Sequence, residues 1–179
     1  MGVRAIYRRQ LREARKVKKS KANEDINRIL FKAKADGRSL GFCCVGIVMH
    51  KRFGWGKTRL DKLLESASAE SVRTENEAVS FVISLYREKV NKKVCATGIL
   101  EQTNDVRKSI YIINRNDYFI LTVALLLETL NDKFGFGTKR IEEIIEYITN
   151  EYVRFNLSKI TPDDYKDKLK EETGFDVRG

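Results

Sequence analysis

The chain has little from which a metal centre, a disulfide framework or a catalytic triad could be built. Its 179 residues include one histidine, His50, and three cysteines, Cys43, Cys44 and Cys95, with no CxxC pair. A usual zinc site or His-based triad needs more than this, and an odd number of thiols makes no disulfide framework. We therefore expect no metal, no cofactor and no enzymatic activity, with Cys43 and Cys44 in the core of a reduced protein.

Long apolar segments are also missing. The longest, 42–49 and 119–127, fall short of the roughly 20 apolar residues that a membrane-spanning helix needs. The N-terminus opens with charged residues and has no apolar signal segment. We expect a cytoplasmic protein that does not enter the membrane.

Proline is nearly absent, and no proline-rich or low-complexity linker divides the chain. One proline and eleven glycines punctuate a sequence rich in Lys, Glu, Leu, Ile and Ala, which are typical of helices. We predict an all-α helical bundle with a basic N-terminal helical segment, 1–22, and two helical repeats, 23–100 and 101–179, packed as one compact body.

Positive charge is concentrated at the N-terminus. The net charge is +10, and residues 1–21 contribute +8 of it through nine Lys or Arg residues and one Glu. The remaining 158 residues carry 26 basic and 24 acidic side chains and are nearly neutral. Such a segment attracts phosphate polymers or anionic surfaces. The alternative is a solvated helix that only keeps the protein soluble.

A glycine-aromatic motif occurs twice. Residues 53–65 (FGWGKTRLDKLLE) and 134–146 (FGFGTKRIEEIIE) align with a constant offset of 81 positions. Each copy predicts an apolar helix, a tight turn and a second helix. The first glycine suits a left-handed helix end, the aromatic residue fills the corner, and the second glycine leaves room at the next helix start. The repeat therefore predicts a duplicated helix–FGxG–helix unit with approximate two-fold symmetry. The structural turn residues are Gly54, Gly56, Gly135 and Gly137.

Helix boundaries follow from apolar periodicity and capping residues. We expect helix over 3–35 with a break near 20–23, a stop at Gly37, and a short helix capped by Ser39. Further helices are expected over 57–68, 76–92, 118–134 (capped by Asp117), 138–155 and 162–172. Residues 93–116 predict a linker and a short helix from about 104, with a short strand pair over 94–100 and 109–113 as the alternative.

Cations stand in the first turn of the helix that follows each motif. Lys57 and Arg59 in one copy, and Lys139 and Arg140 in the other, occupy positions where the helix dipole favours acids. Cations there are unfavourable unless an anion binds, which makes them candidate ligands, although such residues are also common on surfaces. The second copy adds Glu142, Glu143 and Glu146, so only the first has a charge balance suited to an anion.

Residues 49–64 and 130–145 resemble the helix-turn-helix motif, with Gly54 or Gly135 at the turn and apolar residues around it. That resemblance implies a second helix in the major groove of DNA, presenting Lys57, Thr58, Arg59 and Lys62. The same residues resemble the helix-hairpin-helix motif, whose turn amides hold a backbone phosphate. The overall pattern, a small basic protein with a repeated FGxG unit, is similar to proteins of phages and mobile elements.

These observations predict a non-enzymatic nucleic-acid-binding protein, with DNA favoured over RNA, that forms a homodimer. The alternative is a phage-encoded interaction protein that inhibits a host nucleic-acid enzyme, such as a CRISPR nuclease, with its basic arm on an acidic groove or a bound guide RNA. The candidate phosphate-contacting residues are Arg4, Arg8, Arg9, Arg12, Arg15, Lys16, Lys18, Lys19, Lys57, Arg59 and Lys62.

Overall fold

The described residues fold as a bundle of six α-helices. The computed structural model describes residues 3–76, 81–97, 104–158 and 160–177, without the side chains of 3–22, 70–76 and 81. The helices are α1 (Val3–Phe53), α2 (Lys57–Asn76), α3 (Phe81–Ala96), α4 (Val106–Phe134), α5 (Thr138–Ser158) and α6 (Pro162–Thr173). No strand occurs among the described residues, so the predicted all-α class is confirmed.

α1 is one helix of 51 residues, and three sequence-based boundaries inside it are wrong. The helix does not break near 20–23, does not stop at Gly37, and is not restarted by Ser39. Gly37 and Gly41 serve close packing against α4. A Cβ atom at Gly37 would run into the carbonyl oxygen of Arg115, and one at Gly41 would lie 3.0 Å from the Cβ atom of Thr122.

α4 is also longer than predicted, because it unites the short helix expected from about 104 with the helix expected over 118–134. It begins at Val106, where Asp105 caps it by accepting the backbone N–H groups of Arg107 at 2.8 Å and Lys108 at 3.3 Å. Asp117, the predicted cap, is an exposed residue inside the helix. Residues 109–113 are helical, so the alternative strand pair is wrong there, and 98–100 lie outside the described residues.

The shorter helices agree better with prediction. α2 runs to Asn76 instead of ending near 68. α3 spans Phe81–Ala96, so the helix predicted over 76–92 extends further at its C-terminal end, while 77–80 lie outside the described residues. α6 is confirmed: Thr161 and Asp164 form a reciprocal capping box, Pro162 opens the helix, and Gly174 ends it with φ of 71°.

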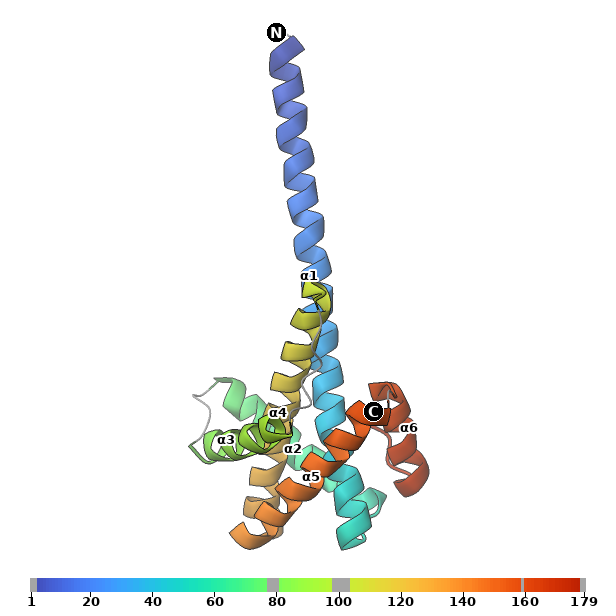
Figure 1. The fold of residues 1–179 in the computed structure, drawn as a ribbon. Helices are drawn as coiled ribbons and strands as arrows, with labels where there is room; N and C mark the ends of the chain where they lie inside the picture. The colour runs from blue at the N-terminus through green and yellow to red at the C-terminus, as the bar shows by residue number, and fades with distance from the viewer. Residues whose placement is uncertain (1–2, 77–80, 98–103, 159, 178–179) are drawn as a thin grey trace.

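α1 and α4 lie side by side and form the centre of the bundle (Figure 1). They run parallel, since Asp25 in α1 meets Arg107 at the start of α4, and Phe53 at the end of α1 packs against Phe136, just past the end of α4. α2 and α3 pack on α4, whereas α5 and α6 pack on α1. Each half of the chain therefore places its shorter helices on the long helix of the other half, so the halves interlock.

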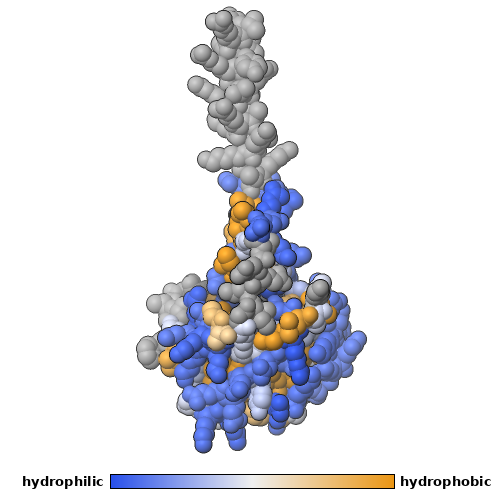
Figure 2. All heavy atoms as spheres, in the orientation of Figure 1, coloured by the Kyte–Doolittle hydropathy of each residue, from blue (hydrophilic) through white to orange (hydrophobic). Residues whose placement is uncertain are grey.

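α1 extends far beyond this body (Figure 1). Below the free end, residues 23–36 of α1 run beside residues 106–117 of α4, and we call this two-helix segment the stalk. Tyr111 donates a hydrogen bond to Asp36 across it. The stalk also exposes apolar side chains, with Phe31 77% and Ile113 60% accessible, and Figure 2 shows this apolar surface above the polar body.

Candidate nucleic-acid interface

Both FGxG turns have the same backbone geometry. Gly54 and Gly135 adopt left-handed conformations with φ of 66° and 69°. The next residue in each turn donates its N–H six positions back: Trp55 to Met49 O at 3.2 Å and Phe136 to Leu130 O at 3.1 Å. These bonds satisfy carbonyl groups that a helix end leaves free, and glycine avoids the penalty of a side chain at positive φ.

In each turn, a side chain of the preceding helix forms a hydrogen bond with a backbone carbonyl of the turn. His50 Nδ1 lies 2.9 Å from the carbonyl oxygen of Trp55, and because a carbonyl only accepts, Nδ1 carries the proton. Asn131 Nδ2 donates to the carbonyl oxygen of Phe136 at 2.7 Å. The two pairs are 81 positions apart. The single histidine of the chain therefore makes the same bond to the turn carbonyl that an asparagine makes in the other turn.

Aromatic side chains pack the two turns against each other. The rings of Phe53 and Phe136 are 5.2 Å apart, those of Trp55 and Phe134 5.1 Å, and those of Trp55 and Phe136 5.9 Å. Trp55 and Phe136 are buried. Because the turns meet here, α2 and α5 begin at adjacent corners, and the cations at their starts lie on the same end of the body.

The predicted cations of the first hairpin are available to a ligand. Lys57, Arg59 and Lys62 are exposed. The guanidinium of Arg59 lies 6.0 Å from the centre of the Trp55 ring, and that of Arg140 lies 5.9 Å from the Phe136 ring. A cation–π contact therefore gives both arginines a partner within the protein, which weakens the argument that a first-turn cation requires a bound anion.

The acidic face of the second hairpin meets lysines of the same chain. A cleft between α3 and α5 is lined by Lys89, Lys92, Lys93 and Lys139 together with Glu142, Glu143 and Glu146. Lys89 Nζ lies 3.3 Å from Glu142 Oε1. Lysines of the same chain therefore face these glutamates. The acidic residues of the second copy are explained by this contact, and no bound ligand is needed to explain them.

The N-terminal cations lie at the opposite end of the molecule from the hairpins. Arg4 to Lys19 belong to the free end of α1, and their side chains are outside the described set. At about 1.5 Å per residue, Lys19 is roughly 50 Å along the helix from Phe53. The structure therefore brings the two hairpins together and leaves the N-terminal segment as a separate group.

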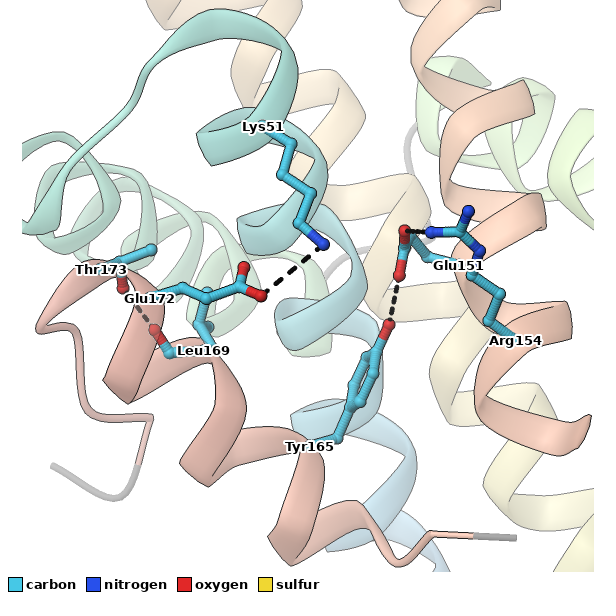
Figure 3. A network of polar contacts seen from close by, with 7 residues as sticks. All are labelled: Lys51, Glu151, Arg154, Tyr165, Leu169, Glu172 and Thr173. Carbon is cyan, nitrogen blue, oxygen red and sulfur yellow. Dashed lines mark hydrogen bonds and ion pairs between the residues drawn. The ribbon is translucent and has the colours of Figure 1, made fainter. Parts of the chain in front are cut away.

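A buried carboxylate on α5, which its sequence pattern did not predict, is bonded to both α5 and α6. Glu151 accepts a hydrogen bond from Arg154 Nη1 at 2.9 Å and from the hydroxyl of Tyr165 at 2.8 Å (Figure 3). Burial, followed by the proximity of Cys44 and Glu151, raises the pKa of Tyr165 well above its usual range, so the hydroxyl stays a donor. The signal in the sequence is the recurrence of Glu70-x-Val-Arg73 as Glu151-x-Val-Arg154, 81 positions later.

A buried arginine forms a second unpredicted polar cluster. Arg115 Nη2 lies 3.3 Å from Asn116 Oδ1 and 3.3 Å from Asn156 Oδ1, and its Nε is buried without a hydrogen-bond partner. The Tyr152 hydroxyl donates to Asn116 Oδ1 at 2.5 Å. Amide oxygens and the rings of Tyr111 and Phe155 surround this cation. The backbone carbonyl of the same arginine is the group that Gly37 approaches most closely.

Within the described part of the chain, no group of three or more His, Cys, Asp or Glu side chains is placed to hold a metal.

α4 is long and apolar enough to cross a membrane by length and composition alone, which differs from the sequence-based expectation. Half of its most apolar window is buried inside the bundle. Comparison of the chain with protein-family models, curated proteins and solved structures finds no match.

Proposed function

We propose that the protein is a non-enzymatic nucleic-acid-binding protein, a regulatory or accessory DNA-binding factor of phage or mobile-element type. The proposal rests on the free end of α1, which projects beyond the bundle (Figure 1). Positions 1–21 contain nine Lys or Arg residues. Helical spacing places neighbours three or four residues apart, as in Arg4, Arg8, Arg12 and Arg15. Such a rod suits contact with successive phosphates.

We also propose that the body arose from two duplicated helix–FGxG–helix units. The support is the recurrence, at an offset of 81, of the turn hydrogen bonds, the His50 and Asn131 contacts, and the stacked arginines. In this arrangement the first hairpin, with Lys57, Arg59 and Lys62, is a secondary phosphate contact. The second hairpin contributes to the fold through the acidic face that meets α3.

The 50 Å between the two cationic groups leads to a test with duplexes of different length. A 10-bp duplex spans about 34 Å and reaches one group, whereas a 25-bp duplex spans about 85 Å and reaches both. We expect neutralisation of Lys57, Arg59 and Lys62 to glutamine to weaken binding of the 25-bp duplex and to leave binding of the 10-bp duplex unchanged.

The N-terminal contribution is measured by the salt dependence of affinity. Neutralising Arg4, Arg8, Arg12 and Arg15 to glutamine removes up to four phosphate contacts, so the slope of log K against log salt should fall by up to about 3.6. A control neutralises Lys92 and Lys93, two exposed lysines of α3 outside both cationic groups, and should change the slope little. An unchanged slope in the N-terminal variant would show that this segment does not bind the duplex.

A protein partner is the second candidate, because the stalk exposes Phe31 and Ile113 next to the basic segment. Single-stranded and random duplex DNA, tested by gel shift at about 50 mM salt, separate the two functions, since electrostatic binding is strongest at low salt. Absence of any shift would favour the inhibitor function or a stalk-mediated homodimer over nucleic-acid binding.

A further inference from the structure

A small polar pocket lies between the end of α1 and the middle of α5. Its volume is about 230 Å³, and its polar lining consists of Lys51, Arg52, Tyr147, Asn150, Glu151 and Arg154. Three of these side chains are cationic and one is anionic. None of the six belongs to the cationic groups proposed above to contact nucleic acid.

The cations of the pocket have partners that leave capacity for a ligand. The guanidinium of Arg52 lies 4.1 Å from the centre of the Tyr147 ring, and in the described part of the chain it has no carboxylate partner. Lys51 Nζ lies 3.6 Å from Glu172 Oε1, at the long limit of an ion pair (Figure 3). Arg154 uses Nη1 for Glu151 and remains 71% exposed.

Glu151 acts as the support of this pocket. Its side chain is only 9% exposed, and each of its oxygens has a partner, Oε1 with Arg154 and Oε2 with Tyr165. A carboxylate held in this way fixes the position of Arg154 and presents no unused oxygen for a metal cation. The lining as a whole keeps a formal excess of two positive charges.

The corresponding place in the other half of the chain has a different composition. At an offset of 81, Arg52 corresponds to Lys133 and stays cationic, whereas Lys51 is replaced by Asp132, Tyr147 by Ser66 and Asn150 by Ala69. The Glu-x-Val-Arg pair and one cation recur in the sequence of both halves, whereas the second cation, the aromatic ring and the amide occur only in this one. A wall needed only for the fold would be expected in both interlocked halves.

We propose that this pocket binds a single phosphate monoester or orthophosphate dianion, held by Arg52, Lys51 and Arg154 with the Asn150 amide as an additional donor. The volume decides the size of the ligand. It lies below the roughly 300–1,000 Å³ of pockets that enclose drug-sized molecules, so it takes a phosphate group and not a whole nucleotide. Arginine forks match phosphate geometry and carry most of the recognition.

Isothermal titration calorimetry of the full chain with sodium phosphate, at constant ionic strength set by chloride, tests the site. We expect one phosphate per chain, and at least about tenfold weaker binding in Arg52→Gln, because a charge-assisted hydrogen bond is lost. The matched control is Arg140→Gln, which removes an arginine stacked on Phe136 outside the pocket and should bind like wild type. Circular dichroism checks that both variants are folded.

Two oligonucleotide arms identify the source of the phosphate. A ten-nucleotide single strand with a 5′-phosphate should bind tighter than its 5′-hydroxyl form if the ligand is a strand end, and equally if it is free phosphate. Only the 5′-phosphate advantage should disappear in Arg52→Gln. Absence of phosphate binding in wild type, or equal binding in Arg52→Gln and Arg140→Gln, would overturn the proposal. The duplex experiments above would be unaffected by either result.

Discussion

Replacing Gly37 with alanine probes the closest approach of α1 to α4. In most helix interiors this change stabilises by about 1 kcal/mol, because alanine has the higher helix propensity. At Gly37 the new Cβ atom would collide with the carbonyl oxygen of Arg115 and come within 2.9 Å of the Cβ atom of Tyr118. Neither atom lies at the end of a flexible side chain, so relief requires movement of a helix backbone.

Three glycines of α1 make the prediction quantitative. Overpacking costs about 1–3 kcal/mol. We place Gly37→Ala at the upper end, with a net loss of about 2 kcal/mol once the propensity gain is subtracted. A Cβ atom at Gly41 would lie 3.0 Å from the Cβ atom of Thr122, and one at Gly46 would lie 3.0 Å from a terminal methyl of Leu169, which can rotate away. The expected order of stability is therefore Gly46→Ala, then Gly41→Ala, then Gly37→Ala.

Thermal unfolding followed by circular dichroism at 222 nm measures these differences. For a chain of this size, a loss of about 2 kcal/mol lowers Tm by roughly 4–8 °C. A helix that ended at Gly37 would also lose stability with alanine, so asparagine separates the two cases. Asparagine tolerates a left-handed helix end but is larger than alanine. Gly37→Asn should be less stable than Gly37→Ala, and the reverse order would refute the packed geometry.

Three further predictions concern His50 and the three cysteines. His50→Asn should keep the turn bond to Trp55 and most of the stability, whereas His50→Ala should lose about 1 kcal/mol in urea unfolding. Cys95 should react with a thiol reagent in the native protein, while Cys43 and Cys44 should react only on unfolding. Burial raises the pKa of Cys43 from 9.0 to about 12, so its contribution to stability is complete below pH 9 and is lost as pH rises towards 12. Cys43→Ala should flatten this alkaline loss relative to Cys95→Ala.

The sequence predicts helices where local chemistry and tertiary packing agree. Thr161, Pro162 and Gly174 set the limits of α6 through their own backbone preferences, and the helix appears there. Gly37 and Asp117 carry equally clear local signals for a stop and a cap, yet both lie inside long helices. Glycine also serves close approach, and only the partner helix shows which role applies. For Gly37, the deciding contacts are with Arg115 and Tyr118, almost 80 positions away.

The candidate site likewise has features that the sequence predicts and features that it does not. The FGxG pattern predicts two turns because φ and capping are local properties of Gly54 and Gly135. The pattern does not show that the turns meet through Trp55 and Phe136, or that Arg59 rests on an aromatic ring. The pocket at Arg52 was missed for a similar reason. Its cations come from the last turn of α1 and from α5, about 100 positions apart, and each alone resembles an ordinary surface residue.

Where the two halves are alike, the shared residues have structural partners: the turn donors, the aromatic corner and the stacked arginines all bond within the protein. A ligand is therefore better sought where the halves differ. The free end of α1 has no counterpart before α4, since the positions equivalent to 3–15 fall within α3. At the pocket, Arg52 corresponds to the cation Lys133, but Lys51 corresponds to Asp132 and Tyr147 to Ser66. If these two asymmetric features carry the binding, restoring symmetry at the pocket with Lys51→Asp should abolish phosphate binding and leave Tm within a degree or two, because exposed ion pairs such as Lys51–Glu172 contribute less than about 1 kcal/mol.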